Sequence, residues 1–286
     1  MANYVGISPV FIAEKQMAEL KQNLLLFDKV GVIMLDYMVT SLKKVGVYPD
    51  FKNELEFLIR EDLLFSFFDS DEDLKILERT ADYQTSIAPL LDEASNIKND
   101  RLAAQLYLPR IASIIYNNEK KDDSVGIPLV PNFSISNDIR TTKTDVINLL
   151  IEEIPIPDSN TPWEAIIDFK NDSDSKGRFA SLKNWVNKTV KSDYSIGEIK
   201  DEIDDLMYQY RKSLDIHKIK HHQGVLQTII VGSAELIENA LRLKFSNIAK
   251  GLFQINQGKA DLMNLELTAP GNELAYIYQA QNKFQK

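Results

Sequence analysis

The chain has 286 residues, of which 44% are hydrophobic and 26% are charged, so it can bury a sizeable core. Its 33 basic and 42 acidic residues give a net charge of −9, which argues against the broad positive field of a general nucleic-acid coat. The absence of cysteine excludes disulfides, thiolate nucleophiles and cysteine-ligated metals. The first residues lack a signal-peptide pattern and no stretch is apolar enough for a membrane span, so we expect a cytoplasmic protein.

Short apolar or β-branched runs predict a small mixed β-sheet in the N-terminal half. The predicted strands are residues 4–11, 29–35, 127–130 and 151–156. Residues 63–68 (LLFSFF) fit either the end of a helix or a strand, because a short apolar run carries no clear period.

Helical periodicity predicts most of the other elements. Within residues 14–27, Met17, Leu20, Leu24 and Phe27 recur at helical spacing. Further helices are expected at 37–45, 49–60, 69–96, 100–116 and 141–150, with Pro89 and Pro109 inside two of them. The chain reads as almost wholly helical from Thr161, with breaks near residues 177, 195, 224 and 258. Ser195 precedes an acidic first turn that contains Glu198, which predicts a helix cap at this position.

These elements predict a helix-dominated α+β fold with a mostly helical C-terminal half. We expect a mixed α/β lobe at residues 1–160 and a helical lobe at residues 161–286. No Gly/Ser-rich or Pro-rich linker separates the lobes, so they are expected to form one continuous globule that is divided near residue 160.

One segment carries a pattern of possible catalytic residues. Asp158, Asp168 and Lys170 have the spacing of restriction-enzyme-type nucleases, in which carboxylates hold a divalent ion and lysine polarises the attacking water. Residues 161–164 (TPWE) also match a capping box with proline at the first helical position. This second pattern predicts Asp168 and Lys170 inside a helix, whereas the nuclease motif lies on a strand. We favour the helix and keep the nuclease as the alternative.

All three histidines lie within residues 215–222 (DIHKIKHH). On a helix, His217 and His221 share a face and are spaced to hold a transition metal. Lys218 and Lys220 would repel a cation, and basic residues are favoured at the C-terminal end of a helix. A solvated helix end is therefore the favoured interpretation, and a metal site is the alternative.

Residues 176–191 form a basic segment without an acidic residue. Lysines beside aromatic rings are typical of nucleic-acid grooves, but Phe179, Leu182, Trp185 and Val186 also recur as one helical face. We favour a core-facing helix with solvated cations, and we expect both Trp163 and Trp185 to be structural. The candidate nucleic-acid-binding residues are Lys176, Arg178, Lys183, Lys188 and Lys191.

The chain resembles an uncharacterised bacterial family, a domain of unknown function. The resemblance rests on the opening strand at residues 4–11, the segment LLLFDKV at 24–30, the stretch from Ile154 to Lys170, and ELAYIY at 273–278. Phe27 stands where the family commonly has tryptophan. The resemblance implies no catalytic residue, and it implies a bacterial or phage-related defence context.

The sequence thus favours a non-enzymatic bacterial interaction or assembly protein without a cofactor. Dense apolar residues at 225–253 and 262–278 predict a protein partner or a homo-oligomer. A metal-dependent nuclease or another nucleic-acid-acting enzyme is the alternative function, and no membrane association is expected.

Overall fold

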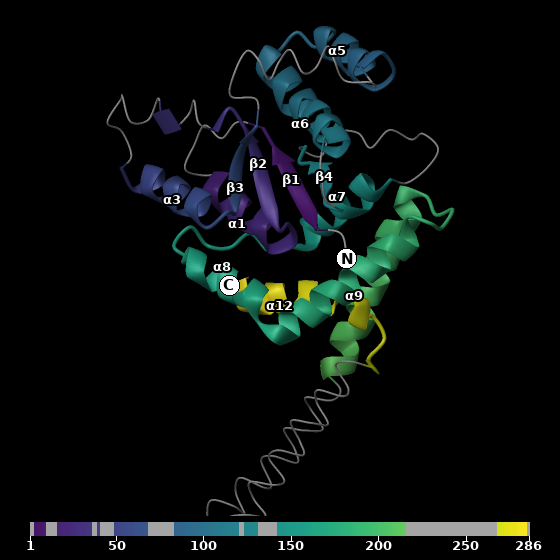
Figure 1. Ribbon diagram of the computed structural model, residues 1–286. Helices are drawn as coiled ribbons and strands as arrows, with labels where there is room; N and C mark the ends of the chain where they lie inside the picture. Colours follow the sequence, from purple (N-terminus) through teal and green to yellow (C-terminus); the bar gives the residue numbers. More distant parts are fainter. Residues whose placement is uncertain are drawn as a thin grey trace, which may run out of the picture. The chain divides into compact units, whose positions relative to one another are not determined.

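A computed structural model describes residues 3–9, 16–35, 39–40, 49–67, 83–119, 123–130, 142–215 and 268–284 (Figure 1). The chain divides into two compact units. Unit 1 is Met1–Asn171 together with Ala280–Lys286, and unit 2 is Asp172–Gln279. The division falls at the end of a helix, and the last helix of the chain begins in unit 2 and ends in unit 1.

Unit 1 is built on a four-stranded sheet in the order β3-β2-β1-β4 (Figure 1). The strands are β1 (Tyr4–Ser8), β2 (Lys29–Ile33), β3 (Leu64–Phe67) and β4 (Val125–Pro128). All the pairings among them are parallel. The predicted helix-dominated α+β fold is confirmed, but the sheet is parallel in its described strands, not mixed.

Helices cover both faces of this sheet. Val5 and Ile7 of β1 pack with Ala112 of α6 (Asp100–Glu119). Gly6 lies between them in the strand and faces the other way, where a Cβ would lie 3.2 Å from Phe27 at the end of α1 (Gln16–Leu26). The helices α1 and α6 therefore cover opposite faces, which keeps the apolar strands away from water on both sides.

The two prolines that were predicted to lie within helical segments both lie in helices. Pro89 stands in the first turn of α5 (Ala88–Ser95), directly after the short π-helix η1 (Tyr83–Ile87). Pro109 lies inside α6. The helix α3 (Pro49–Arg60) has the predicted bounds. The predicted helix at 37–45 lies mostly outside the described residues, and residues 69–82 of the helix predicted at 69–96 lie wholly outside them. No described helix is long and apolar enough to cross a membrane.

Residues 151–156 do not form the predicted strand. A capping box between Thr142 and Asp145 starts α7 (Lys143–Glu153), and the helix runs through residues 151–153. Its inward face is wholly apolar, so packing favours helix where the isoleucines alone suggest a strand. Buried on that face are Val146, Ile147, Leu149 and Leu150. The fourth strand of the sheet is instead β3, within the ambiguous run 63–68.

The end of the chain completes unit 1. Phe284 of α12 (Ala275–Phe284) packs edge-on against Phe169 of α8 (Trp163–Asn171), with ring centroids 5.4 Å apart. Gln281 Nε2 donates a hydrogen bond to the backbone oxygen of Glu153 at 2.8 Å. Residues 280–284 are thus part of the packing of unit 1.

Unit 2 is helical in its described part, as predicted for this region. It contains α9 (Ser173–Thr189), helical residues 196–215, the 3-10 turn η2 (Asn272–Leu274) and the start of α12. The predicted break near Gly177 is wrong, because α9 continues through it; one glycine costs a helix only about 1 kcal/mol. The predicted break at Ser195 is confirmed. Those at 224 and 258 lie outside the described residues.

Gly271 allows η2 to approach the helix formed by residues 196–215. Its φ is +80°, and a Cβ at this position would lie 2.0 Å from the backbone oxygen of Leu206. A side chain is therefore excluded both by backbone conformation and by space. Next to this contact, Tyr210 and Leu214 pack with Ala269 and Ala275.

Candidate functional site

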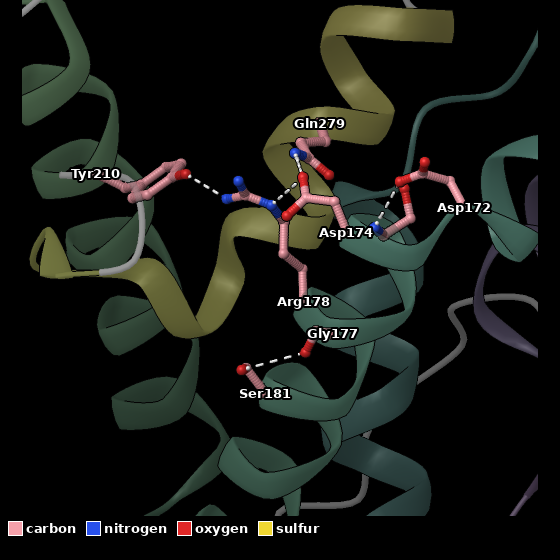
Figure 2. Close-up of polar contacts among 8 residues, drawn as sticks. Asp172, Asp174, Gly177, Arg178, Ser181, Tyr210 and Gln279 are labelled. Atoms are coloured by element: carbon pink, nitrogen blue, oxygen red, sulfur yellow. Dashed lines mark hydrogen bonds and ion pairs between the residues drawn. The ribbon is translucent and has the colours of Figure 1, made fainter. Parts of the chain in front are cut away.

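A buried polar network surrounds Arg178 in unit 2 (Figure 2). The Arg178 side chain is buried; its Nη1 donates to Tyr210 Oη at 2.9 Å and its Nε donates to Asp174 Oδ2 at 3.0 Å. Gln279 Nε2 donates to the same carboxylate oxygen at 2.9 Å. One guanidinium and its carboxylate thus connect α9 with the helix at 196–215 and with α12. Since these partners are side chains of unit 2 itself, the network ties helices together.

Hydrogen bonds keep two carboxylates of unit 2 ionised. Burial raises the pKa of Asp174, but hydrogen bonds from Gln279 and Arg178, with the charge of Arg178, outweigh it and hold the pKa below its usual range. The backbone N–H and the hydroxyl of Ser195 likewise lower the pKa of Glu198. Ser195 and Glu198 form the predicted cap, with Ser195 N and Oγ each 2.8 Å from Glu198 Oε2.

The helix at residues 196–215 presents a stripe of exposed side chains, which we call the Tyr208 stripe. Its inward face is buried and apolar at residues 199, 203, 207, 210 and 214. The outward face repeats at three- and four-residue spacing, so its side chains lie in one row along the helix. The stripe consists of Asp201, Asp204, Asp205, Tyr208, Arg211, Lys212 and Asp215, and each is exposed.

Tyr208 is the one aromatic residue in this stripe. It is 61% exposed, and the Nζ of Lys212 lies 5.6 Å from its ring centroid. Gln209 Nε2 donates to Asp205 Oδ2 at 2.6 Å beside it. Tyr194, just before the helix, is 50% exposed. An aromatic ring that is exposed among charged residues is the type of side chain that protein interfaces enrich.

Unit 1 contains a buried lysine with no accessible amine. Lys21 of α1 is 2% exposed; its Nζ donates to the backbone oxygen of Ser159 at 2.6 Å and lies 5.0 Å from the Trp163 ring centroid. Burial lowers the pKa of Lys21, and the charges of Glu54 and Asp158 partly oppose this shift. Trp163 Nε1 donates to Glu54 Oε2 at 2.9 Å. The lysine therefore fastens α1 to the loop that precedes α8.

The candidate nuclease residues lie on a loop and a helix. Asp168 and Lys170 belong to α8, which confirms the prediction that they are helical. The Lys170 amine donates to the backbone oxygen of Phe27, and Asp158 Oδ1 accepts from its neighbour Asn160 N at 2.8 Å. Asp158 and Asp168 are both exposed. Across the described residues, no three His, Asp or Glu side chains gather to hold a metal ion.

The start of α8 differs from the predicted one in the position of the proline. Helix α8 begins at Trp163, so Pro162 precedes the first helical residue and does not occupy it. The assigned ends of helices commonly vary by one or two residues. Here Ala165 N donates a hydrogen bond to Pro162 O at 3.1 Å, so Pro162 still takes part in the first turn.

The five candidate nucleic-acid-binding residues do not share one exposed surface. Arg178 and Lys183 are buried, at 5% and 6% exposure, and Lys183 Nζ lies 4.6 Å from the Phe179 ring centroid. The exposed members are Lys176, Lys188 and Lys191. Trp185 is buried and donates to Glu202 Oε1 at 3.3 Å, so its ring is not an open stacking platform.

Two further predictions concern the C-terminal third. His217 and His221, with residues 225–253, lie outside the described residues. Within 268–278, the apolar side chains expected to form an interface are instead core: Leu274, Ala275, Tyr276 and Ile277 are at most 1% exposed. These four side chains of the predicted interaction segment are therefore buried inside the chain and are not exposed to a partner.

No protein-family model, curated protein or solved structure matches this chain. The resemblance to an uncharacterised bacterial family stays a prediction from the sequence.

Sequence patterns missed the Tyr208 stripe and the buried Lys21. The acidic start of the stripe is visible in the sequence, but carboxylates are common in the first turns of helices, where they interact favourably with the helix dipole. The sequence signal for the stripe is a single tyrosine, Tyr208, that lies seven residues from Asp201 and seven from Asp215, on one face of a helix. No local signal marks Lys21, because its partners lie more than a hundred residues away in the chain.

Proposed function

We propose that the chain is a non-enzymatic interaction component of a cytoplasmic bacterial assembly, and that it binds its partner through the Tyr208 stripe. The observation that carries this proposal is the 61% exposure of Tyr208 on a helix whose opposite face is fully packed. An aromatic ring held in water is unfavourable by itself, and a binding partner that covers it would recover that free energy.

Rigidity of the helix supports the same proposal. Ile199, Ile203, Met207 and Leu214 are each at most 3% exposed, so the helix is anchored along its length. A helix fixed in this way presents its outward side chains in one geometry and loses little conformational entropy on binding. The charged residues around Tyr208 would then form the polar rim of an interface.

The nuclease alternative receives less support. Its motif requires carboxylates and lysine at a strand, whereas Asp168 and Lys170 lie on α8 and the Lys170 amine is bonded to a backbone oxygen. No observation in the described residues favours that chemistry over an interaction role.

The strand order favours a second candidate function, which is small-ligand binding by unit 1. The order reverses between β1 and β4, where Ile7 is paired with Pro128 at the carboxyl end of the strands. Parallel sheets with helices on both faces commonly bind ligands outside such a switch point. A panel of nucleotides and sugar phosphates tests this by thermal shift: a saturable rise in melting temperature supports it, and no shift with any compound rejects it.

A photo-crosslinking amino acid in place of Tyr208 tests the interaction proposal. The variant is produced in the cells that naturally make the chain and is then irradiated. We expect one defined crosslinked product from position 208. A matched variant at Asp168, which is exposed on α8 of unit 1, should give none. Equal products from both positions, or none from position 208, would reject the stripe as the binding surface.

The defence context implied by the resemblance has its own test. Cells that carry the chain and its neighbouring genes are challenged with a phage panel, and so are cells that lack the chain. A lower plaque count that requires the chain supports a defence role, and equal counts across the panel count against it.

A further inference from the structure

We infer that the partner of the Tyr208 stripe is a second copy of the same chain, docked antiparallel about a two-fold axis at Tyr208. This inference rests on the proposed function and specifies its partner. It is carried by the distribution of charge along the exposed stripe.

The stripe has opposite charges at equal distances from Tyr208. Asp204 and Asp205 lie four and three residues before it, and Arg211 and Lys212 lie three and four residues after it. All four are exposed with Tyr208 on the same face. At about 1.5 Å of rise per residue, each charge lies about 5–6 Å along the helix from the ring.

An antiparallel pair places positions at equal distances from the axis opposite each other. Asp204 would then face Lys212 of the second copy, and Asp205 would face Arg211. The two-fold axis repeats each pair, so a self-complementary interface with two ion pairs on each side of the tyrosines results. A parallel pair would instead set Asp204 and Asp205 against the same two carboxylates, which like-charge repulsion disfavours.

The ends of the stripe confine the contact to its middle. Asp201 and Asp215 both lie seven residues from Tyr208, so they would oppose each other with the same charge. Arg211 also interacts within its own chain, which makes the pairing of Lys212 with Asp204 the primary contact. One helix on another buries less than a standard interface, so we expect association at about micromolar concentration that weakens with salt.

Charge reversal tests the inference. One variant carries Asp204→Lys and Asp205→Lys, and the other carries Arg211→Glu and Lys212→Glu. The wild-type chain is expected to be a dimer by sedimentation equilibrium at low salt, and each variant alone should dissociate at least about tenfold more readily. An equimolar mixture of the two variants should restore a one-to-one dimer, because every opposed pair is again of opposite charge.

Two variants control for charge reversal as such. Glu164→Lys with Asp168→Lys, and Lys188→Glu with Lys191→Glu, reverse pairs of exposed charges elsewhere. Both control variants are expected to dimerise as readily as the wild-type chain does. Circular dichroism establishes that each variant is folded, since the changed side chains lie on exposed faces.

A monomeric wild-type chain overturns the inference, as do variants that stay dimeric or a mixture that stays monomeric. The crosslinking experiment separates this failure from failure of the proposed function. A product at twice the chain mass supports self-pairing. A defined product with another protein keeps the interaction role and overturns self-pairing, and no product rejects both.

Discussion

The buried Lys21 of unit 1 and the buried Arg178 of unit 2 have different hydrogen-bond partners. Unit 1 packs apolar side chains on a parallel sheet, and among its described residues Tyr4 and Lys21 are buried, with the Lys21 amine bonded to the backbone oxygen of Ser159. Unit 2 packs helices around a buried guanidinium whose carboxylate partner is ionised. The comparison teaches that each unit holds a group that should cost it stability at a different end of the pH scale, Tyr4 in alkali for unit 1 and Asp174 in acid for unit 2.

The close approach of the backbone at Gly271 to the helix at residues 196–215 should make this position the most sensitive to substitution of those compared. Gly271→Val combines a positive φ with a Cβ that would meet the Leu206 oxygen at 2.0 Å, so we expect a loss of at least about 4 kcal/mol. Gly177→Ala is the matched control, because no atom lies within 4 Å of its Cβ; it should stabilise α9 by about 0.5–1 kcal/mol. Urea denaturation measures both. A tolerated Gly271→Val would contradict the packing of η2.

The tryptophans compare the two cores directly. Trp185→Ala in unit 2 and Trp163→Ala in unit 1 should each cost about 3–5 kcal/mol, since both rings are buried. Chemical denaturation and binding of a labelled oligonucleotide are measured on the same Trp185→Ala protein. Unchanged stability together with weakened oligonucleotide binding would instead make Trp185 a stacking residue.

Unit 1 should lose stability in alkali. Burial, and secondarily the charge of Asp28, raise the pKa of Tyr4 from 10.0 to about 12. The folded state keeps the phenol proton that the unfolded chain loses near pH 10. Stability therefore falls as the pH rises from 10 to 12, by roughly 2–3 kcal/mol. Hydrogen exchange of β1 measured across this range should show the loss in the wild type but not in Tyr4→Phe. An equal loss of stability in both proteins would mean that a group other than Tyr4 causes it.

Unit 2 should instead lose stability in acid, by a smaller amount. The pKa of Asp174 lies below its ordinary 3.8, so its contribution is present above that pH and is lost as the pH falls through the folded value. The side chain is 41% exposed, so solvent screening limits the effect to about 1 kcal/mol or less. Asp174→Asn should flatten the acid limb of the stability curve, as read from hydrogen exchange of α9. If the fall of stability in acid is the same in Asp174→Asn as in the wild type, Asp174 is not its cause.

Sequence patterns located the elements that local chemistry determines. The run KVGVI at residues 29–33 is β-branched and buried, and it is a strand; Ser195 and Glu198 form the predicted cap. The run LFSF at 64–67 could not be assigned, because its pairing with β2 decides its structure and no local period records that pairing.

The candidate site was harder to predict, because its contacts join residues that are far apart in the sequence. Arg178 looked like one cation in a basic segment. It is buried because Tyr210 lies 32 positions further along the chain and offers its hydroxyl. The outward row around Tyr208 could be recognised only after packing had established which face of the helix is buried.

The return of the chain to unit 1 bears on how the protein is made. Residues 280–284 supply Phe284 to the ring of Phe169 and Gln281 to the oxygen of Glu153. A ribosome releases these residues only after all of unit 2 has been synthesised. Unit 2 is thus inserted between two segments of unit 1, and the Phe169 ring gains its contact with Phe284 only after residues 280–284 have been synthesised. A chaperone that recognises exposed aromatic surface would have its longest opportunity on the older half of the nascent chain.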